Sequence, residues 1–88
     1  MKHAADKALD GIEDLLAAVR SYPELKEKKR GIFYCKSRAF LHFHEDAAGL
    51  FADMRINGQF QRFAVNSSAE QKEFRAALKT VLLPAQVK

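Results

Sequence analysis

Apolar residues near the start of the chain recur at the spacing of an α-helix. Four of them are separated by three, four and three positions and so share one side of a helix: Leu9, Ile12, Leu16 and Val19. Gly11 weakens the first turns, because glycine costs about 1 kcal/mol relative to alanine inside a helix. The pattern predicts a helix over about residues 6–20, and Pro23 prevents it from continuing.

The middle of the chain has a shorter period, is rich in phenylalanine and is divided by turn residues. Asn57-Gly58 is the clearest turn, since this dipeptide is typical of two-residue hairpin loops. Ser37-Arg38 and Ala47-Ala48-Gly49 indicate two more turns. Between the turns we expect four strands, over about residues 32–36, 39–45, 50–56 and 59–65. The charged segment 24–31 before them is predicted to be a basic linker.

The end of the chain predicts a second helix. Ser67 followed by Glu70 fits a capping box, and the helix is expected over about residues 68–83, stopped by Pro84. The order of elements predicts an α+β fold in a single domain over residues 1–88. This fold is a four-stranded antiparallel meander sheet flanked by an N-terminal and a C-terminal helix, with both helices on one face.

The turns also predict which residues share a face, because side chains alternate along a strand. A loop at Asn57-Gly58 places Asp53 opposite Arg62 on the side away from the helices. The other two loops extend this assignment, and they place Ile32 and Tyr34 on the helix side. The far side is then predicted to carry Phe33, Cys35, Phe40, His42, His44, Phe51, Asp53, Arg55, Phe60 and Arg62.

Four phenylalanines on the far side would form an apolar patch: Phe33, Phe40, Phe51 and Phe60. Such a patch on a small domain is typical of an interface, and a homodimer that packs sheet against sheet would cover it. This pattern predicts a non-enzymatic interaction module that self-associates through the far side or through its edge strands. Polar specificity would come from His42, Asp53, Arg55 and Arg62.

The charge balance allows a second function, which is nucleic-acid binding. The chain has 15 Lys and Arg against 11 Asp and Glu, a net charge of +4. Aromatic and basic side chains that alternate on a sheet are typical of platforms on which unpaired bases stack. The cations that would contact phosphates lie in the linker and the first hairpin: Lys26, Lys28, Lys29, Arg30, Lys36 and Arg38.

Two arrangements on the far side indicate possible chemistry. His42 and His44 point the same way on one strand, and with Asp53 they could hold a divalent transition metal. Cys35, His42 and Asp53 on neighbouring strands have the order of a nucleophile, a base and an orienting acid. The sequence contains no nucleophile-elbow motif, no glycine-rich phosphate-binding loop and no pair of cysteines with the spacing of a zinc site. We therefore expect no cofactor and no catalytic residue.

The single cysteine, Cys35, excludes an intramolecular disulfide. The first residues have no apolar segment of a signal peptide, and the apolar run over residues 15–19 is much shorter than a membrane span. These features predict a cytoplasmic protein with no membrane partner.

The order of elements resembles that of the MmcQ/YjbR-like family. The resemblance lies in a first helix that ends near Tyr22-Pro23-Glu24-Leu25, a basic linker, and the hairpin segment that runs from Gly31 to Phe40. It covers about the first half of the chain. The resemblance implies a compact α+β "double wing" domain linked to DNA binding, and it assigns no functional residue.

Overall fold

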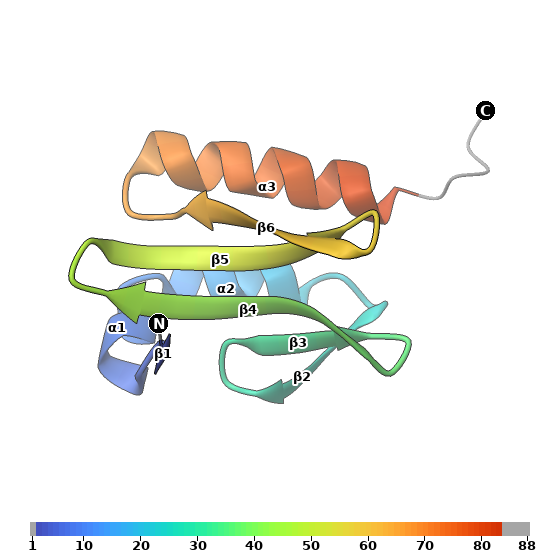
Figure 1. Ribbon diagram of the computed structural model, residues 1–88, viewed down its shortest axis with the longest axis horizontal. Coiled ribbons are helices and arrows are strands. Elements are labelled where there is room, and N and C mark those ends of the chain that lie inside the picture. The colour runs from blue at the N-terminus through green and yellow to red at the C-terminus, as the bar shows by residue number, and fades with distance from the viewer. Residues whose placement is uncertain (1, 84–88) are drawn as a thin grey trace.

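A computed structural model gives the fold over residues 2–83, with side chains described from Ala4 onward. The fold is α+β, with an antiparallel sheet and helices at both ends of the chain, as predicted (Figure 1). The elements are β1 (Lys2–His3), α1 (Asp6–Asp10), α2 (Glu13–Arg20), β2 (Leu25–Lys29), β3 (Ile32–Cys35), β4 (Arg38–Asp46), β5 (Gly49–Ile56), β6 (Gln59–Ala64) and α3 (Ser68–Leu82).

The sheet has more strands than the four predicted. Five strands lie in the order β2-β3-β4-β5-β6, and the two-residue β1 pairs with β4 beside the end of β3. The segment predicted to be a basic linker is therefore largely the edge strand β2. Leu25 packs against the core while Lys26 lies opposite Tyr34 at the surface. Lysine-rich composition suits an edge strand, where charge discourages pairing with other chains.

The first predicted helix is divided into α1 and α2 at Gly11 and Ile12. Ile12 has φ −125° and ψ 32°, outside the helical region, although its side chain is buried. Arg30 spans the break, because its guanidinium contacts the carboxylates of Asp6 and Glu13. The last helix ends at Leu82, and the Ser67–Glu70 capping box is confirmed. Pro84, expected to stop it, lies outside the described residues.

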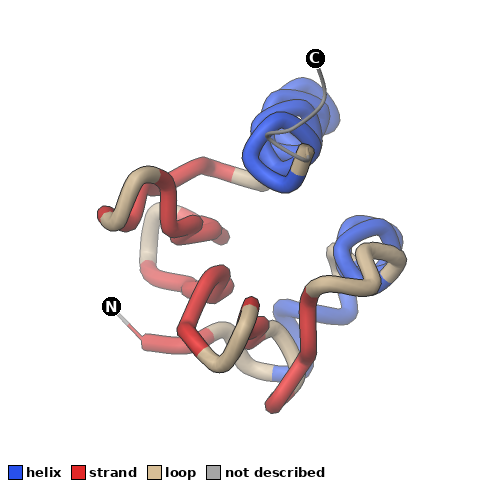
Figure 2. Tube along the Cα trace, turned by 90° about the vertical axis from the view of Figure 1, so that its right-hand side faces the viewer, coloured by secondary structure: helices blue, strands red, loops and turns tan. Residues whose placement is uncertain are grey.

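Helices α2 and α3 lie on the same face of the curved sheet, as predicted (Figure 2). The core lies between them and the strands. It is formed by Leu15, Leu16 and Val19 of α2, Phe74 and Leu78 of α3, and inward side chains of the strands such as Phe43 and Met54. Within residues 2–83, no helix is both long enough and apolar enough to cross a membrane.

The predicted registers of the second and third hairpins are confirmed. Asp46 pairs with Gly49, and His42 lies opposite Asp53. Asn57 and Gly58 have φ values of 54° and 84°, as a two-residue type I′ turn requires, and Asp53 lies opposite Arg62. These pairs place the residues of β5 and β6, and those of β4 from Leu41 onward, on the faces that the sequence predicts.

The first hairpin differs from the prediction by one residue. Its loop is Lys36-Ser37, with φ values of 52° and 70°, so Cys35 rather than Lys36 closes the turn. Phe40 is an extra residue in β4, because Tyr34 pairs with Ala39 and Phe33 pairs with Leu41.

The extra residue Phe40 exchanges the faces of β3. Phe33 and Phe40 are 1% and 6% exposed and belong to the core, so their predicted place on the far side is wrong. Cys35 also packs against the core, whereas Ile32 lies opposite His42 on the other side. We call the side of the sheet turned away from α2 and α3 the open face. It carries Ile32, Tyr34, His42, His44, Phe51, Asp53, Arg55, Phe60 and Arg62.

Candidate functional site

An ionic cluster lies at the centre of the open face, around Asp53 of β5. The Arg62 guanidinium donates from Nε to Oδ1 at 2.9 Å and from its terminal nitrogen to Oδ2 at 3.1 Å. His44 Nε2 lies 3.2 Å from Oδ2 of the same carboxylate. The hydrogen bonds from Arg62 hold the pKa of Asp53 below its usual value, against a partial burial that would raise it. The Asp53 carboxylate is therefore held ionised and neutralised by its neighbours.

Aromatic rings beside this cluster are each in contact with a cation. The Arg55 guanidinium lies 4.6 Å from the ring centre of Phe60, and that of Arg62 lies 5.8 Å from Phe51. Arg55 is fixed by a hydrogen bond from Nε to the Ala39 carbonyl at 2.8 Å. Phe60 keeps 42% of its surface exposed. The result is a surface of planar groups rather than a continuous apolar patch.

His42 connects this surface to the β2–β3 hairpin. Its ring centre lies 5.0 Å from that of Phe60, and the two planes are inclined by 37°. On its other side, a cavity of about 380 Å³ is lined by His42, Ala39, Ile32, Tyr34, Lys28 and Lys29. Three rings, from Tyr34 through His42 to Phe60, thus form a row across the open face. We call this the aromatic row.

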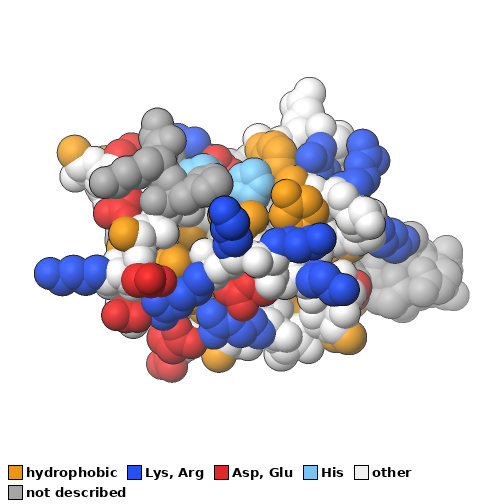
Figure 3. All heavy atoms as spheres, turned by 90° about the horizontal axis from the view of Figure 1, so that it is seen from below, with side chains coloured by type: hydrophobic (Ala, Val, Ile, Leu, Met, Phe, Trp, Pro, Cys, Tyr) orange, Lys and Arg blue, Asp and Glu red, His pale blue; other side chains and the backbone are white. Residues whose placement is uncertain are grey.

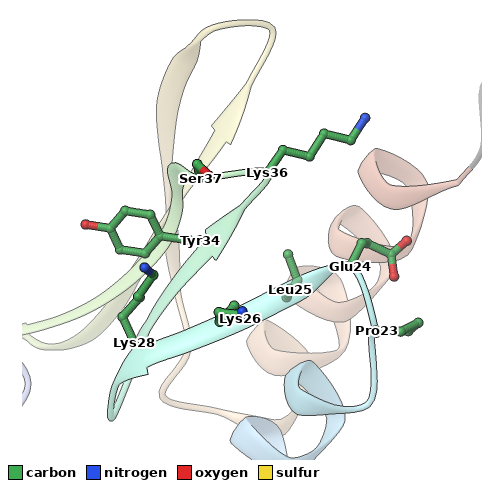
Figure 4. A pocket seen from close by; sticks show the side chains of 8 residues that line it. All are labelled: Pro23, Glu24, Leu25, Lys26, Lys28, Tyr34, Lys36 and Ser37. Carbon is green, nitrogen blue, oxygen red and sulfur yellow. The ribbon is translucent and has the colours of Figure 1, made fainter.

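Tyr34 stands between two cavities. The second, of about 280 Å³, is lined by Pro23, Glu24, Leu25, Lys26, Lys28, Tyr34, Lys36 and Ser37. Figure 4 shows Lys28 of β2 and Tyr34 of β3 pointing toward one another, while Lys36 extends from the turn. The Lys28 Nζ lies 5.3 Å from the centre of the Tyr34 ring. The hairpin therefore presents one aromatic ring among several ammonium groups.

The cations predicted to contact phosphates fall into two groups. Lys26, Lys28 and Lys36 line the cavity beside Tyr34, and Lys29 lines the next one. Arg38 is exposed at the start of β4. Arg30 instead turns back to the helices, where it contacts Asp6, Asp10 and Glu13 at 2.8–3.1 Å. These hydrogen bonds raise the pKa of Arg30, so its charge is already neutralised and it is removed from the predicted set.

Charge is distributed unevenly over the molecule. Four acids lie on the first two helices: Asp6, Asp10, Glu13 and Asp14. In Figure 3, histidine side chains lie beside hydrophobic ones with lysine and arginine side chains near them, and acidic side chains lie among basic ones elsewhere and next to the histidines. Because Asp53 is paired, the open face and the hairpin beside it are left with an excess of positive charge.

The two chemical arrangements predicted from sequence do not form. Among the side chains that the structure describes, no three His, Cys, Asp or Glu residues are grouped so that they could hold a metal ion. Asp53 is instead occupied by Arg62 and His44, and the ring of His42 packs on Phe60. Cys35 lies against the core while His42 is on the open face, so they cannot act together.

Tyr34 is the member of the site that sequence reasoning missed. The sequence pattern places it on the helix side, because nothing in the pattern predicts the bulge at Phe40. The neighbouring strand β2 alternates in burial from Leu25 to Lys28, but only Leu25 among these residues is apolar, so their hydropathy pattern does not indicate a strand.

Comparison with known proteins identifies no relative: no family model, curated protein or solved structure matches the chain. The resemblance to the MmcQ/YjbR-like family stays a prediction.

Proposed function

We propose that the protein is a non-enzymatic module that binds single-stranded nucleic acid on its open face. The observation that supports this most directly is the aromatic row, with Tyr34 between two cavities and cations along both sides. Stacking of unpaired bases on aromatic rings or guanidinium planes contributes about 1–3 kcal/mol per base. A single strand that follows the row would place bases on Tyr34, His42 and Phe60.

The lysines beside the row supply the complementary contacts. Lys26, Lys28 and Lys36 surround the cavity at one end of the row, where the phosphates of a bound strand would pass. Contacts of this kind position the backbone and do not read sequence. The module is therefore expected to bind single strands with weak sequence preference.

Self-association through an apolar sheet face has less support than the sequence indicates. Two of its four expected phenylalanines, Phe33 and Phe40, are buried in the core. The other two, Phe51 and Phe60, are covered in part by Arg62 and Arg55. A dimer that packed two such faces together would bring arginines of one copy against arginines of the other. This repulsion would be absent if the face were an apolar patch.

Binding can be measured by fluorescence anisotropy with labelled DNA and RNA strands of about 12 nucleotides, a length within the usual site sizes. If about four phosphates are neutralised, the binding constant should fall roughly 50-fold between 50 and 200 mM salt, because each contributes about 0.7 to the logarithmic slope. Tyr34→Ala should weaken binding roughly 10-fold through loss of one stacked base. Lys28→Ala should lower the salt slope by about 0.7.

Lys72→Ala is the matched control, since Lys72 is an exposed cation on α3, which lies on the other face of the sheet. It should leave both affinity and slope unchanged. Binding that is undetectable, insensitive to salt, or equally sensitive to Lys72→Ala and Lys28→Ala would contradict the proposal. Tighter binding to duplex than to single strands would contradict the stacking model.

A further inference from the structure

The two edges of the sheet differ in how well they are protected from pairing with another chain. The β2 edge carries Lys26, Lys28 and Lys29, and its register with β3 is interrupted between Glu27 and Lys29. Lysines and bulges are the usual devices that block an edge. The β6 edge has a single charged residue, Arg62, and its register with β5 is uninterrupted from Gln59 to Ala64.

The backbone groups that β6 directs outward follow from the pairing with β5. Val65 N–H donates to the Leu50 carbonyl at 3.1 Å, so the odd-numbered residues bond toward β5. Hydrogen bonding alternates along an antiparallel strand, and the backbone groups of Phe60, Arg62 and Ala64 therefore point away from the sheet. Residues 59–62 are exposed, so these groups are accessible to another strand.

We infer that a second copy of this chain pairs with β6, antiparallel, about a two-fold axis at Gln61. In this register Phe60 of each copy lies opposite Arg62 of the other, and both residues use their outward backbone groups. The two pairs exchange four hydrogen bonds. On the open face, Arg62, whose charge is paired with Asp53, is then the cross-strand neighbour of Phe60 of the other copy, so no like charges are opposed.

The neighbouring registers are less favourable. An axis at Arg62 places two guanidinium groups directly opposite each other, and like charges at opposed positions destabilise a sheet. An axis at Phe60 brings the outward groups of Arg62 against the turn at Gly58, where β6 has not begun. Of these three registers, the axis at Gln61 is the one that forms four hydrogen bonds without opposing like charges.

This pairing joins the five strands β2 to β6 of each copy into one continuous sheet, with the two open faces side by side. The inference does not depend on the proposed function, because the contacts are made by the edge of β6. A dimer that does not bind nucleic acid would contradict only the proposed function. A monomer that binds nucleic acid would contradict only the pairing through β6.

Gln61 gives a specific test, because the residue on a two-fold axis is the one that faces its own counterpart. Light scattering after size exclusion should give twice the 10.0 kDa chain mass for the unaltered protein. Gln61→Glu and Gln61→Lys should each be monomeric, since each opposes two like charges at a close, non-hydrogen-bonded pair. An equal mixture of the two variants should recover the dimer mass.

The exposed position of Gln61 means that both variants should fold, which circular dichroism will establish before mixing. Recovery of the dimer in the mixture also requires that both are folded. Lys79→Glu, an exposed charge change on α3, is the control and should remain dimeric. A monomeric unaltered protein, dimers that persist in both single variants, or a mixture that stays monomeric would each overturn the inference.

Discussion

The hairpins β3–β4 and β5–β6 are both closed by two-residue turns with positive φ, but their strands behave differently beyond the turn. From Asn57-Gly58 the strands β5 and β6 stay in register to the end of their pairing. From Lys36-Ser37 the strands β3 and β4 stay in register for two pairs, after which Phe40 is inserted. A bulge of this kind rotates the residues that follow it relative to the partner strand.

This difference separates two parts of the open face. In the regular part, Asp53 meets Arg62 across the strands, and Arg55 is held by the Ala39 carbonyl and the Phe60 ring. In the irregular part, the bulge sends Phe33 and Phe40 into the core and turns Tyr34 outward between two cavities. The regular part is thus already satisfied by its own contacts, while the irregular part offers an aromatic ring and lysines to a ligand.

Substitution of Phe33 should give the largest change in stability that tests this comparison between the two parts of the open face. Phe33→Ala should destabilise the fold by about 3–5 kcal/mol, the cost of removing a buried phenyl ring. Phe60→Ala is the matched control in the regular part, and it should cost about 1 kcal/mol because the ring is 42% exposed and loses one cation–aromatic contact. Urea unfolding followed by circular dichroism measures both changes. Similar losses for the two variants would mean that the bulge does not place Phe33 in the core.

Most of the fold could be predicted from the sequence, because local signals determine it. Asn57-Gly58 fixed one register, and residues such as Met54 and Asp53 then fell on the expected faces. The capping box at Ser67 fixed the start of α3. A turn dipeptide with one strongly favoured conformation specifies the position of the loop, and the position of the loop specifies the register of the two strands that it joins.

The candidate site was harder to predict because it depends on packing between distant residues. Lys36 and Ser37 are unusual residues for positive φ, so the loop was placed one residue too late. Phe40 is an ordinary strand residue, and only its burial against the core explains why the chain makes an extra step there. This one extra residue exchanges the faces of Phe33 and Tyr34.

Asp53 tests the regular part with a smaller effect. At neutral pH, Asp53→Asn should cost about 1–2 kcal/mol, since it removes a charged partner from both Arg62 and His44. The pKa of Asp53 is lowered in the folded protein, so its stabilising contribution is present above the unfolded pKa of about 4 and is lost as pH falls through the folded pKa. The stabilities of the variant and the unaltered protein should therefore converge as the pH falls below the unfolded pKa and through the lowered folded pKa. Glu73→Gln, on the exposed side of α3, is the control for loss of a carboxylate. A difference that stays constant from neutral to acid pH would show that the ionised form of Asp53 is not what stabilises the sheet.

Ser37 tests the turn of the irregular hairpin, and its effect is the smallest and of opposite sign. A non-glycine residue in the left-handed region is strained by about 1–2 kcal/mol, which glycine relieves while adding entropy to the unfolded chain. The net gain for Ser37→Gly should be about 0.5 kcal/mol, or a rise in Tm of about 2–4 °C for a domain of this size. Ala48 occupies the corresponding second position of the β4–β5 loop without a positive φ, so Ala48→Gly should lower the Tm.

If the loop were Ser37-Arg38, as the sequence indicates, Ser37 would occupy its first position and Arg38 its second. Arg38→Gly would then be the stabilising change, whereas with Cys35 paired to Arg38 it removes a strand residue and should destabilise the hairpin.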